Sequence, residues 1–122
     1  MNQFSEFSWS NLDSCDPRLR EIFVEVIKGV DCRVTCGHRN REDQNFAYDE
    51  GMSQLKWPLS KHNKLPSMAV DVIPYPVDWT DRERFHHLAG YVKAIAKTMD
   101  IDIIWGGDWN FKDLPHYELR KT

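Results

Sequence analysis

The amino-acid sequence predicts an α+β fold, in which a small, largely antiparallel sheet with flanking helices forms a single compact domain. The chain has 122 residues, a length that suits one domain and leaves little room for a second. Segments with the apolar spacing of helices are mixed with short strand-like segments, without the regular alternation that builds parallel βαβ units. Residues 1–122 are therefore expected to form one domain.

The first predicted helix covers residues 17 to about 29. Asp16 can act as the N-cap, and Pro17 suits the first helical position because its missing N–H is not needed there. Gly29 and Asp31 mark the end of the helix. Its apolar residues repeat at steps of three and four along one face, at Leu19, Ile22, Phe23, Val26, Ile27 and Val30.

A short strand, a short helix and a loop are predicted next. Residues 32–36 have a strand-forming composition. Asn40 can cap a second helix, which continues to about residue 50, where Gly51 can end it. Residues 52–67 contain prolines and show no periodicity, so they are predicted to form an irregular loop.

The following strand is predicted over residues 68–73. Its alternation places Ala69, Asp71 and Ile73 on one face, and the two valines between them on the other. An ionisable residue therefore lies in the middle of an otherwise apolar strand.

A long helix and two strands complete the predicted fold. Thr80 followed by Glu83 is typical of a capping box at a helix N-terminus. Strands are predicted over residues 101–105, where two glycines end the run, and over residues 116–119. The apolar face of the long helix consists of Phe85, Leu88, Val92, Ile95 and Met99.

Charge and hydropathy exclude several classes of protein. The formal net charge is −3 and no block of Lys or Arg occurs, which argues against a nucleic-acid binder. The N-terminus lacks the basic start and apolar run of a secretory signal, and no apolar run is long enough to span a bilayer. We therefore expect a protein that does not insert into membranes, stays in the cytoplasm unless something releases it, and acts as a monomer.

The three cysteines are predicted to be buried free thiols. An odd number cannot form a fully paired framework within one chain, so a reducing compartment is the simpler interpretation. Cys32 and Cys36 could also form half of a metal site, but no second pair stands at a matching spacing. The third thiol is Cys15.

Three segments carry side chains that can bind a metal, at His62, Asp71 and His116. A catalytic zinc site uses three protein ligands and keeps a fourth position open, which two imidazoles and one carboxylate can satisfy. A carboxylate inside an apolar strand is costly unless it is paired or bound to metal. The alternatives are a buried ion pair or hydrogen-bonded carboxylate for Asp71 and a solvated loop histidine for His62.

The segment before the last strand combines Asp113 with His116. Two residues three apart in a strand point to opposite faces, so these side chains can converge only if the chain bends between them. Pro115 suits such a bend, which places Asp113 in a loop and His116 at the first position of the strand. Glu118 lies on the same face as His116 and could orient it, or could instead form a cross-strand salt bridge. None of His38, His86 and His87 is assigned to the metal.

Three sequence strings resemble motifs of the M15 peptidases. Residues 60–71, SKHNKLPSMAVD, resemble the family pattern S-x-H-x(n)-A-x-D. Residues 105–109, WGGDW, with residues 113–118, DLPHYE, resemble its closing motif, and residues 36–44, CGHRNREDQ, resemble its G-Y-R-S…Q segment. The family comprises zinc D-Ala-D-Ala carboxypeptidases and dipeptidases and phage L-alanyl-D-glutamate endopeptidases, which cut peptides of bacterial peptidoglycan.

The resemblance implies a role for each matched residue. It implies Zn²⁺ as the cofactor, with His62, Asp71 and His116 as ligands, and Asp113 as the general base where many members carry Glu. It implies Arg39 as the cation that faces the developing oxyanion. Support from the surroundings of the site is expected from Ser60, Gln44 and Glu118, and a lining of the substrate cleft from Trp109 and Asp108. The sequence departs from the pattern at His38, Asn40 and Pro66.

The function that this resemblance implies is hydrolysis of a peptide bond in the peptide stem of bacterial peptidoglycan. We expect an L-alanyl-D-glutamate endopeptidase that acts as a phage endolysin, held in the host cytoplasm until it is released to the periplasm and the cell wall. The alternatives are a D-Ala-D-Ala carboxypeptidase or dipeptidase of the same family, and a non-enzymatic cell-wall-binding domain.

Overall fold

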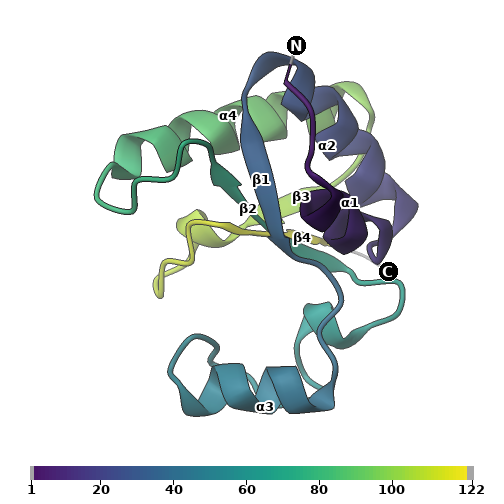
Figure 1. Ribbon diagram of the computed structural model, residues 1–122, viewed down its shortest axis with the longest axis vertical. Helices are drawn as coiled ribbons and strands as arrows, with labels where there is room; N and C mark the ends of the chain where they lie inside the picture. The colour runs from purple at the N-terminus through teal and green to yellow at the C-terminus, as the bar shows by residue number, and fades with distance from the viewer. Residues whose placement is uncertain (1, 121–122) are drawn as a thin grey trace.

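The computed structural model describes residues 2–120 and confirms the predicted α+β fold. A four-stranded antiparallel sheet with the order β1-β2-β4-β3 lies at its centre (Figure 1). The strands are β1 (Cys32–Cys36), β2 (Ala69–Pro74), β3 (Ile103–Trp105) and β4 (His116–Leu119). The helices are α1 (Glu6–Asp13), α2 (Pro17–Gly29), α3 (Arg41–Asp49) and α4 (Arg82–Thr98), with short 3-10 helices η1 (Lys61–Asn63) and η2 (Gly106–Asp108).

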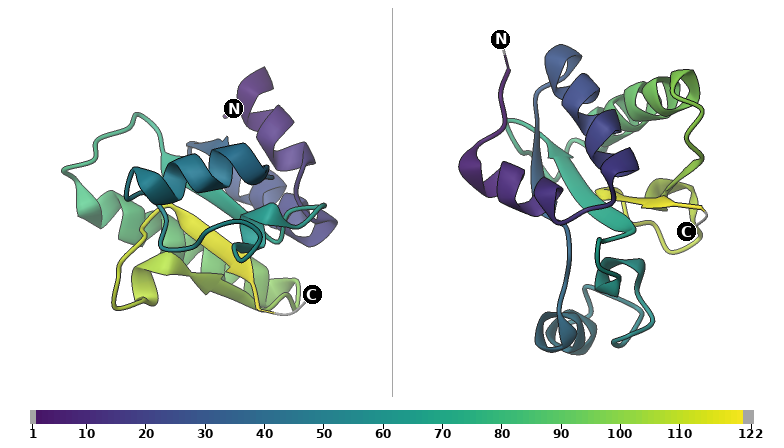
Figure 2. Two further views of the ribbon diagram at one scale, coloured as in Figure 1. Left: turned by 90° about the horizontal axis from the view of Figure 1, so that it is seen from below. Right: turned by 90° about the vertical axis from the view of Figure 1, so that its right-hand side faces the viewer.

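The two faces of the sheet have different neighbours. Helices α2 and α4 contact each other and pack on one face, where Val70 and Val72 of β2 join their apolar residues in the main core cluster. Asp71 lies between these valines and points to the opposite face, as the alternation of the strand predicts. Helix α3 stands away from α2 and α4, beyond the end of β1 (Figures 1 and 2).

Helix α1 was not predicted from the sequence. Its only buried residues are Ser8 and Leu12, so it has no apolar stripe that periodicity could detect. Instead it covers β1, which is an edge strand of the sheet. The Val34 N–H donates to Ser8 Oγ at 3.1 Å, and Asn11 Nδ2 donates to the Val34 carbonyl at 3.0 Å. These side chains satisfy backbone groups that an open sheet edge would leave unpaired.

Most predicted helix ends are confirmed. Asp16 caps α2 by accepting from the Arg18 N–H, and Asn40 caps α3 by accepting from the Asp43 N–H. Gly51 follows α3 with a φ of 77°, a conformation that glycine adopts without strain.

Several boundaries differ from the prediction, and β2 spans Ala69–Pro74 rather than residues 68–73. The Thr80 capping box is wrong, because Thr80 Oγ1 donates to Asp78 Oδ1 at 2.6 Å and α4 begins at Arg82. The strand predicted from residue 101 begins at Ile103, since the Ile101 N–H closes the end of α4 by donating to the Ala96 carbonyl. The loop predicted over residues 52–67 contains η1. No helix within residues 2–120 is long and apolar enough to cross a membrane.

Replacing Tyr117 by Phe tests the packing of the core beneath the site. The Tyr117 side chain is fully buried against Phe23, and its hydroxyl has no hydrogen-bond partner within residues 2–120. Because an unpaired buried polar group costs roughly 1–3 kcal/mol, Tyr117→Phe should leave the free energy of unfolding unchanged or raise it by about 1 kcal/mol. Urea denaturation measures this change.

Tyr117→Ala provides the contrast, since loss of the buried ring should lower the free energy of unfolding by about 3–5 kcal/mol. A clear loss of stability in Tyr117→Phe would show that the hydroxyl does form a stabilising hydrogen bond in solution.

Candidate metal centre

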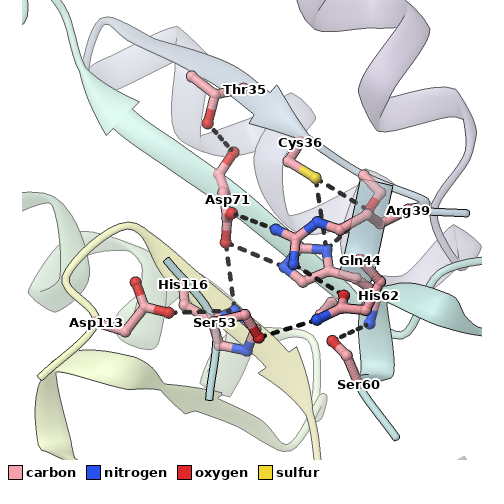
Figure 3. A network of polar contacts seen from close by, with 12 residues as sticks. Thr35, Cys36, Arg39, Gln44, Ser53, Ser60, His62, Asp71, Asp113 and His116 are labelled. Carbon is pink, nitrogen blue, oxygen red and sulfur yellow. Dashed lines mark hydrogen bonds and ion pairs between the residues drawn. The ribbon is translucent and has the colours of Figure 1, made fainter. Parts of the chain in front are cut away.

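Three ligand-type side chains converge on the face of the sheet that α2 and α4 leave free (Figure 3). Asp71 comes from β2 and His116 from β4, where the antiparallel register places the two residues directly opposite each other. His62 comes from η1. Asp71 Oδ1 lies 3.2 Å from His62 Nε2 and 3.3 Å from His116 Nδ1. The structure thus brings the three predicted ligands together.

The turn that carries His62 is fixed by its own capping box. Ser60 Oγ accepts from the His62 N–H at 3.1 Å, and Asn63 Oδ1 accepts from the Ser60 N–H at 3.0 Å. Ser60 is therefore close to the site through the backbone that it holds, rather than through a contact with Asp71.

The second nitrogen of each imidazole is bonded to an acceptor. His62 Nδ1 lies 2.8 Å from the Gly37 carbonyl oxygen, and His116 Nε2 lies 2.8 Å from Glu118 Oε1. Each of these nitrogens donates its hydrogen to that acceptor, which directs the lone pair of the other nitrogen toward Asp71. A carboxylate oxygen and two imidazole nitrogens then face one another, an arrangement that protons on the imidazoles or a metal cation can stabilise.

The electrostatics of the cluster lead to the same conclusion. Burial opposes protonation of His62, but the Asp71 charge outweighs it and raises the pKa of His62 to about 10. Burial likewise lowers the pKa of His116, but hydrogen bonds to Asp71 and Glu118 outweigh burial and raise that pKa. Burial also disfavours the Asp71 carboxylate, yet the two imidazoles hold its pKa well below the usual range. Positive charge stabilises this carboxylate, and either protons or a divalent cation can supply it.

The spacing of these atoms suits zinc. Ligand atoms about 2.0–2.1 Å from a tetrahedral Zn²⁺ lie about 3.3–3.4 Å from one another. The two distances from Asp71 Oδ1, 3.2 and 3.3 Å, fall close to this range. The donor chemistry of the three residues and the two separations from Asp71 Oδ1 therefore fit a zinc ion.

Cys36 is a competing ligand that the sequence analysis placed among the buried thiols. Cys15 and Cys32 are buried as predicted, but Cys36 is partly exposed, and its Sγ lies 3.9 Å from His62 Nδ1. Ligand atoms of Cys36, His62 and Asp71 all lie within 4.8 Å of one another. Binding through His62 Nδ1 would break its hydrogen bond to the Gly37 carbonyl, so we favour the set with His116.

Arg39 borders the three candidate metal ligands, and its guanidinium is oriented by Gln44. Its Nη2 lies 3.5 Å from Asp71 Oδ2, and its Nη1 donates to Gln44 Oε1 at 3.0 Å. Gln44 is fully buried and donates in turn to Ser53 Oγ and the Leu55 carbonyl. Gln44 thus ties the guanidinium to α3 and to the loop that follows it.

Asn63 adds a second support that the sequence analysis missed. Its Nδ2 donates to the Arg39 carbonyl at 3.0 Å and to Gln44 Oε1 at 3.1 Å, while its Oδ1 belongs to the capping box of η1. One side chain therefore joins the backbone of Ser60, at the start of η1, to that of Arg39. Its position one residue after His62 was the only sequence signal.

Asp113 lies in the loop before β4, and the chain turns at Leu114 and Pro115 as predicted. This turn brings Asp113 Oδ2 to 4.0 Å from His116 Nδ1. Burial, and then the charge of Asp71, raise the pKa of Asp113. Asp113 is thus a partly exposed carboxylate at the edge of the cluster that can exchange a proton more readily than Asp71.

Of the remaining predicted residues, Glu118 and Trp109 lie beside His116, whereas Asp108 lies outside the cleft. Glu118 contacts His116 as expected of a residue that orients it, and its ion pair, at 3.2 Å, is with Lys61 of η1 rather than across the strands. The Trp109 ring lies 5.0 Å from that of His116. Asp108 does not line the cleft as expected, because its exposed carboxylate bonds to Lys93 of α4 at 2.7 Å.

A cavity of about 1000 Å³ opens above the cluster. The metal-ligand candidates form its floor together with Arg39 and Asp113. One wall comes from α3 and the loop after it, and the other from the segments around Trp79 and around Trp109. The site is therefore a cleft large enough for a peptide, with the candidate metal ligands and the candidate general base at the bottom of the cleft.

Comparisons with known proteins agree with this geometry. Residues 1–122 match the family described as phage L-alanyl-D-glutamate peptidase. The L-alanyl-D-glutamate peptidase of Escherichia phage T5 is 28% identical over 126 residues, which cover 98% of this chain and 90% of that protein.

Two solved structures resemble most of the chain. The Serratia marcescens L-Ala D-Glu endopeptidase ChiX has a TM-score of 0.82 and 29% identity, covering 97% of this chain and 90% of its own. The D,D-pentapeptidase VanY of a VanB-type vancomycin resistance cassette, solved in complex with Zn(II), has a TM-score of 0.58 and 19% identity. That match covers 86% of this chain and 70% of VanY and shows a shared fold.

Zinc titration of single variants distinguishes the two possible ligand sets. We expect His116→Ala to lose high-affinity Zn²⁺ binding and Cys36→Ser to retain it. Glu118→Gln should weaken binding by roughly 10–100-fold, the usual effect of removing an outer partner of a ligand histidine. Competition with a chromophoric zinc chelator measures the affinity, and Asp108→Ala is the control because Asp108 lies outside the cleft. Retention of zinc by His116→Ala together with its loss in Cys36→Ser would assign the metal to the cysteine set.

Proposed function

The chain belongs to the phage L-alanyl-D-glutamate peptidase family, and from this premise we propose that it is a zinc peptidase that hydrolyses the L-alanyl-D-glutamate bond of bacterial peptidoglycan. The observation that carries the proposal is the convergence of His62, Asp71 and His116, with the second nitrogen of each imidazole already bonded to an acceptor. The bond itself is proposed from the relatives in phage T5 and Serratia marcescens.

The proposed ligands of Zn²⁺ are His62, Asp71 and His116. Bound there, the ion would supply Lewis acidity, which lowers the pKa of a water molecule and polarises the scissile carbonyl. Gly37 and Glu118 keep the hydrogens of the two imidazoles on the nitrogens that face away from Asp71. These contacts prepare the ligand set before substrate arrives.

Asp113 is the proposed general base. Its carboxylate accepts a proton from the attacking water and returns it to the leaving amine, so no covalent intermediate with the enzyme is needed. Asp113 Oδ2 lies 4.0 Å from His116 Nδ1, so the carboxylate is at the edge of the candidate metal ligands and open to the cleft. A raised pKa favours this exchange, because the group can hold the proton between the two transfers.

Arg39 is the proposed stabiliser of the oxyanion that forms at the scissile carbonyl. Its guanidinium is mostly buried beside Asp71 and is oriented by Gln44. A fixed cation in a site shielded from water stabilises developing negative charge without having to reorganise during the reaction.

Two rival functions are less well supported. A D-Ala-D-Ala carboxypeptidase or dipeptidase function would have to be inferred from VanY, but that protein is only 19% identical and supports the fold alone. A non-enzymatic wall-binding domain has no need of a base and an oxyanion cation, yet Asp113 and Arg39 both line the cleft.

We propose in addition that the enzyme acts as a phage endolysin. It would remain in the host cytoplasm until it reaches the periplasm and the wall. A monomer suffices for this role, because the candidate ligands, base and oxyanion cation come from one chain. Neither nucleic acid nor membrane insertion is part of the proposal.

Two variants test the mechanism. Asp113→Ala should bind zinc as the wild type does and should lower the rate of peptidoglycan hydrolysis by about 10²–10⁴-fold, the usual contribution of a general base. Arg39→Ala should lower kcat by about 10²–10³-fold, the usual cost of removing one oxyanion donor. Turbidity loss of purified Gram-negative peptidoglycan measures the rate, and mass spectrometry of the released peptides identifies the bond.

Asp108→Ala should hydrolyse at the wild-type rate and serves as the control for loss of a surface carboxylate. Wild-type hydrolysis by Asp113→Ala would remove the proposed base. Release of D-alanine, rather than of stems cut after L-alanine, would favour the carboxypeptidase function.

A further inference from the structure

The cleft is larger than the reacting bond requires. Two residues of extended peptide span only about 7 Å, whereas the cavity has a volume of about 1000 Å³. Its wall opposite α3 presents two aromatic side chains that the proposed mechanism does not use. Trp79 is 61% exposed and Phe111 is 52% exposed, and both line the cavity.

Trp79 is held in place despite its exposure. Its ring stacks on that of Phe85, with centroids 5.3 Å apart and an angle of 26° between the planes, and Phe85 is buried in the body of the protein. One face of the indole is thus covered by the protein. An aromatic ring that is already fixed loses little conformational entropy when a ligand packs against it.

The loops that carry these two residues lie on the same side of the molecule. Trp79 belongs to the loop between β2 and α4, and Phe111 to the loop between η2 and β4. Both loops project to the left in Figure 1, and the view from below in Figure 2 agrees. The two aromatic residues are therefore part of one cleft wall, continuous with the metal cluster at its floor.

The chemistry of the proposed substrate places a sugar close to this wall. In peptidoglycan, the amine of L-alanine is joined to the lactyl group of N-acetylmuramic acid. A single residue, about 3.3–3.6 Å of chain, therefore separates the scissile carbonyl from the lactyl group. An enzyme that cuts after this L-alanine in the intact wall must accommodate the sugar beside its catalytic groups. The apolar C–H face of a pyranose ring is suited to pack on an aromatic surface.

We propose that Trp79 and Phe111 form a subsite for the N-acetylmuramic acid ring that precedes the scissile L-alanine. This inference rests on the proposed function and deepens it, because it makes the enzyme selective for stems that are still attached to the glycan. The other occupant of such a wall would be the peptide on the far side of the bond, and the experiment below separates the two.

The experiment compares two substrates that differ only in the sugar. One is a disaccharide-linked stem peptide, and the other is the same stem peptide whose L-alanine nitrogen carries only a lactyl group, so that it remains an uncharged amide. The selectivity is the ratio of their kcat/KM values. Trp79→Ala should lower this ratio by roughly tenfold, the loss expected for one stacked aromatic contact, chiefly through a higher KM for the linked substrate. Phe111→Ala should change the ratio in the same direction.

Trp9→Ala is the matched control. Trp9 of α1 is 40% exposed and contacts the buried Phe4 ring edge to face, with ring centroids 5.4 Å apart, but it does not line the cavity. It should leave the selectivity unchanged. Trp79→Tyr keeps an aromatic ring and should restore most of the selectivity, which separates a binding role from a loss of folding.

An equal fall for both substrates in Trp79→Ala would assign the wall to the peptide, and an unchanged ratio would remove the subsite. Failure of the wild type to cut either substrate would instead contradict the proposed function. In that case, the affinities of the linked and free stems for the Asp113→Ala protein, with and without Trp79→Ala, still test the subsite. Calorimetry should then show that Trp79→Ala lowers the affinity for the linked stem but not for the free stem. If Trp79→Ala leaves the affinity for the linked stem unchanged, the inference is overturned.

Discussion

The organisation of the site depends on one buried carboxylate in an apolar strand. Asp71 shares β2 with valines that complete the core, so the strand cannot shift by one residue without burying the carboxylate among α2 and α4. The carboxylate in turn requires positive charge around it, because an uncompensated buried charge is costly. His62, His116 and Arg39 supply nitrogen atoms on three sides, each from a different segment of the chain. Packing on one face of the sheet thereby fixes the register that aligns the ligands on the other.

Two glycines make the close approaches at this centre possible. A Cβ atom at Gly37 would collide with the Asn11 carbonyl and with Ser14 of the α1 region, and Gly37 is the residue whose carbonyl orients His62. A Cβ atom at Gly106 would collide with the Asp113 carbonyl, and the same backbone accepts the Asp113 N–H. The ligand and the base are thus positioned through backbone contacts that a larger residue would displace. These glycines contribute to the site although neither carries a functional group.

Local signals in the sequence predicted the elements but not all of their partners. The caps at Asp16 and Asn40 and the apolar stripe of α2 are local features, and they located helices correctly. Helix α1 lacked such a stripe because it binds β1 through polar side chains. Thr80 satisfied a capping pattern, yet Asp78 bonds its hydroxyl first.

The candidate site shows the same division between local and tertiary information. The motifs identified the three side chains that converge at the centre, whereas the proximity of Cys36 to His62 and the bridging by Asn63 arise from segments that meet only in the folded chain. Asp108 was misplaced because a motif gives the order of residues and not their direction. The turn of η2 directs Asp108 toward α4, while Trp109 faces the ring of His116.

The different roles proposed for the carboxylates of Asp71 and Asp113 follow from their surroundings. Asp71 lies between two imidazoles that hold its pKa well below the usual range, so it remains ionised and serves as a ligand. The Asp113 carboxylate lies farther from the imidazoles, with its Oδ2 4.0 Å from His116 Nδ1, and burial together with the Asp71 charge raises its pKa. A pair of carboxylates whose pKa values are displaced in opposite directions separates the charged role from the proton-transfer role. The Asp71 charge that attracts cations thus also favours a proton on Asp113, so one buried charge acts on both carboxylate roles.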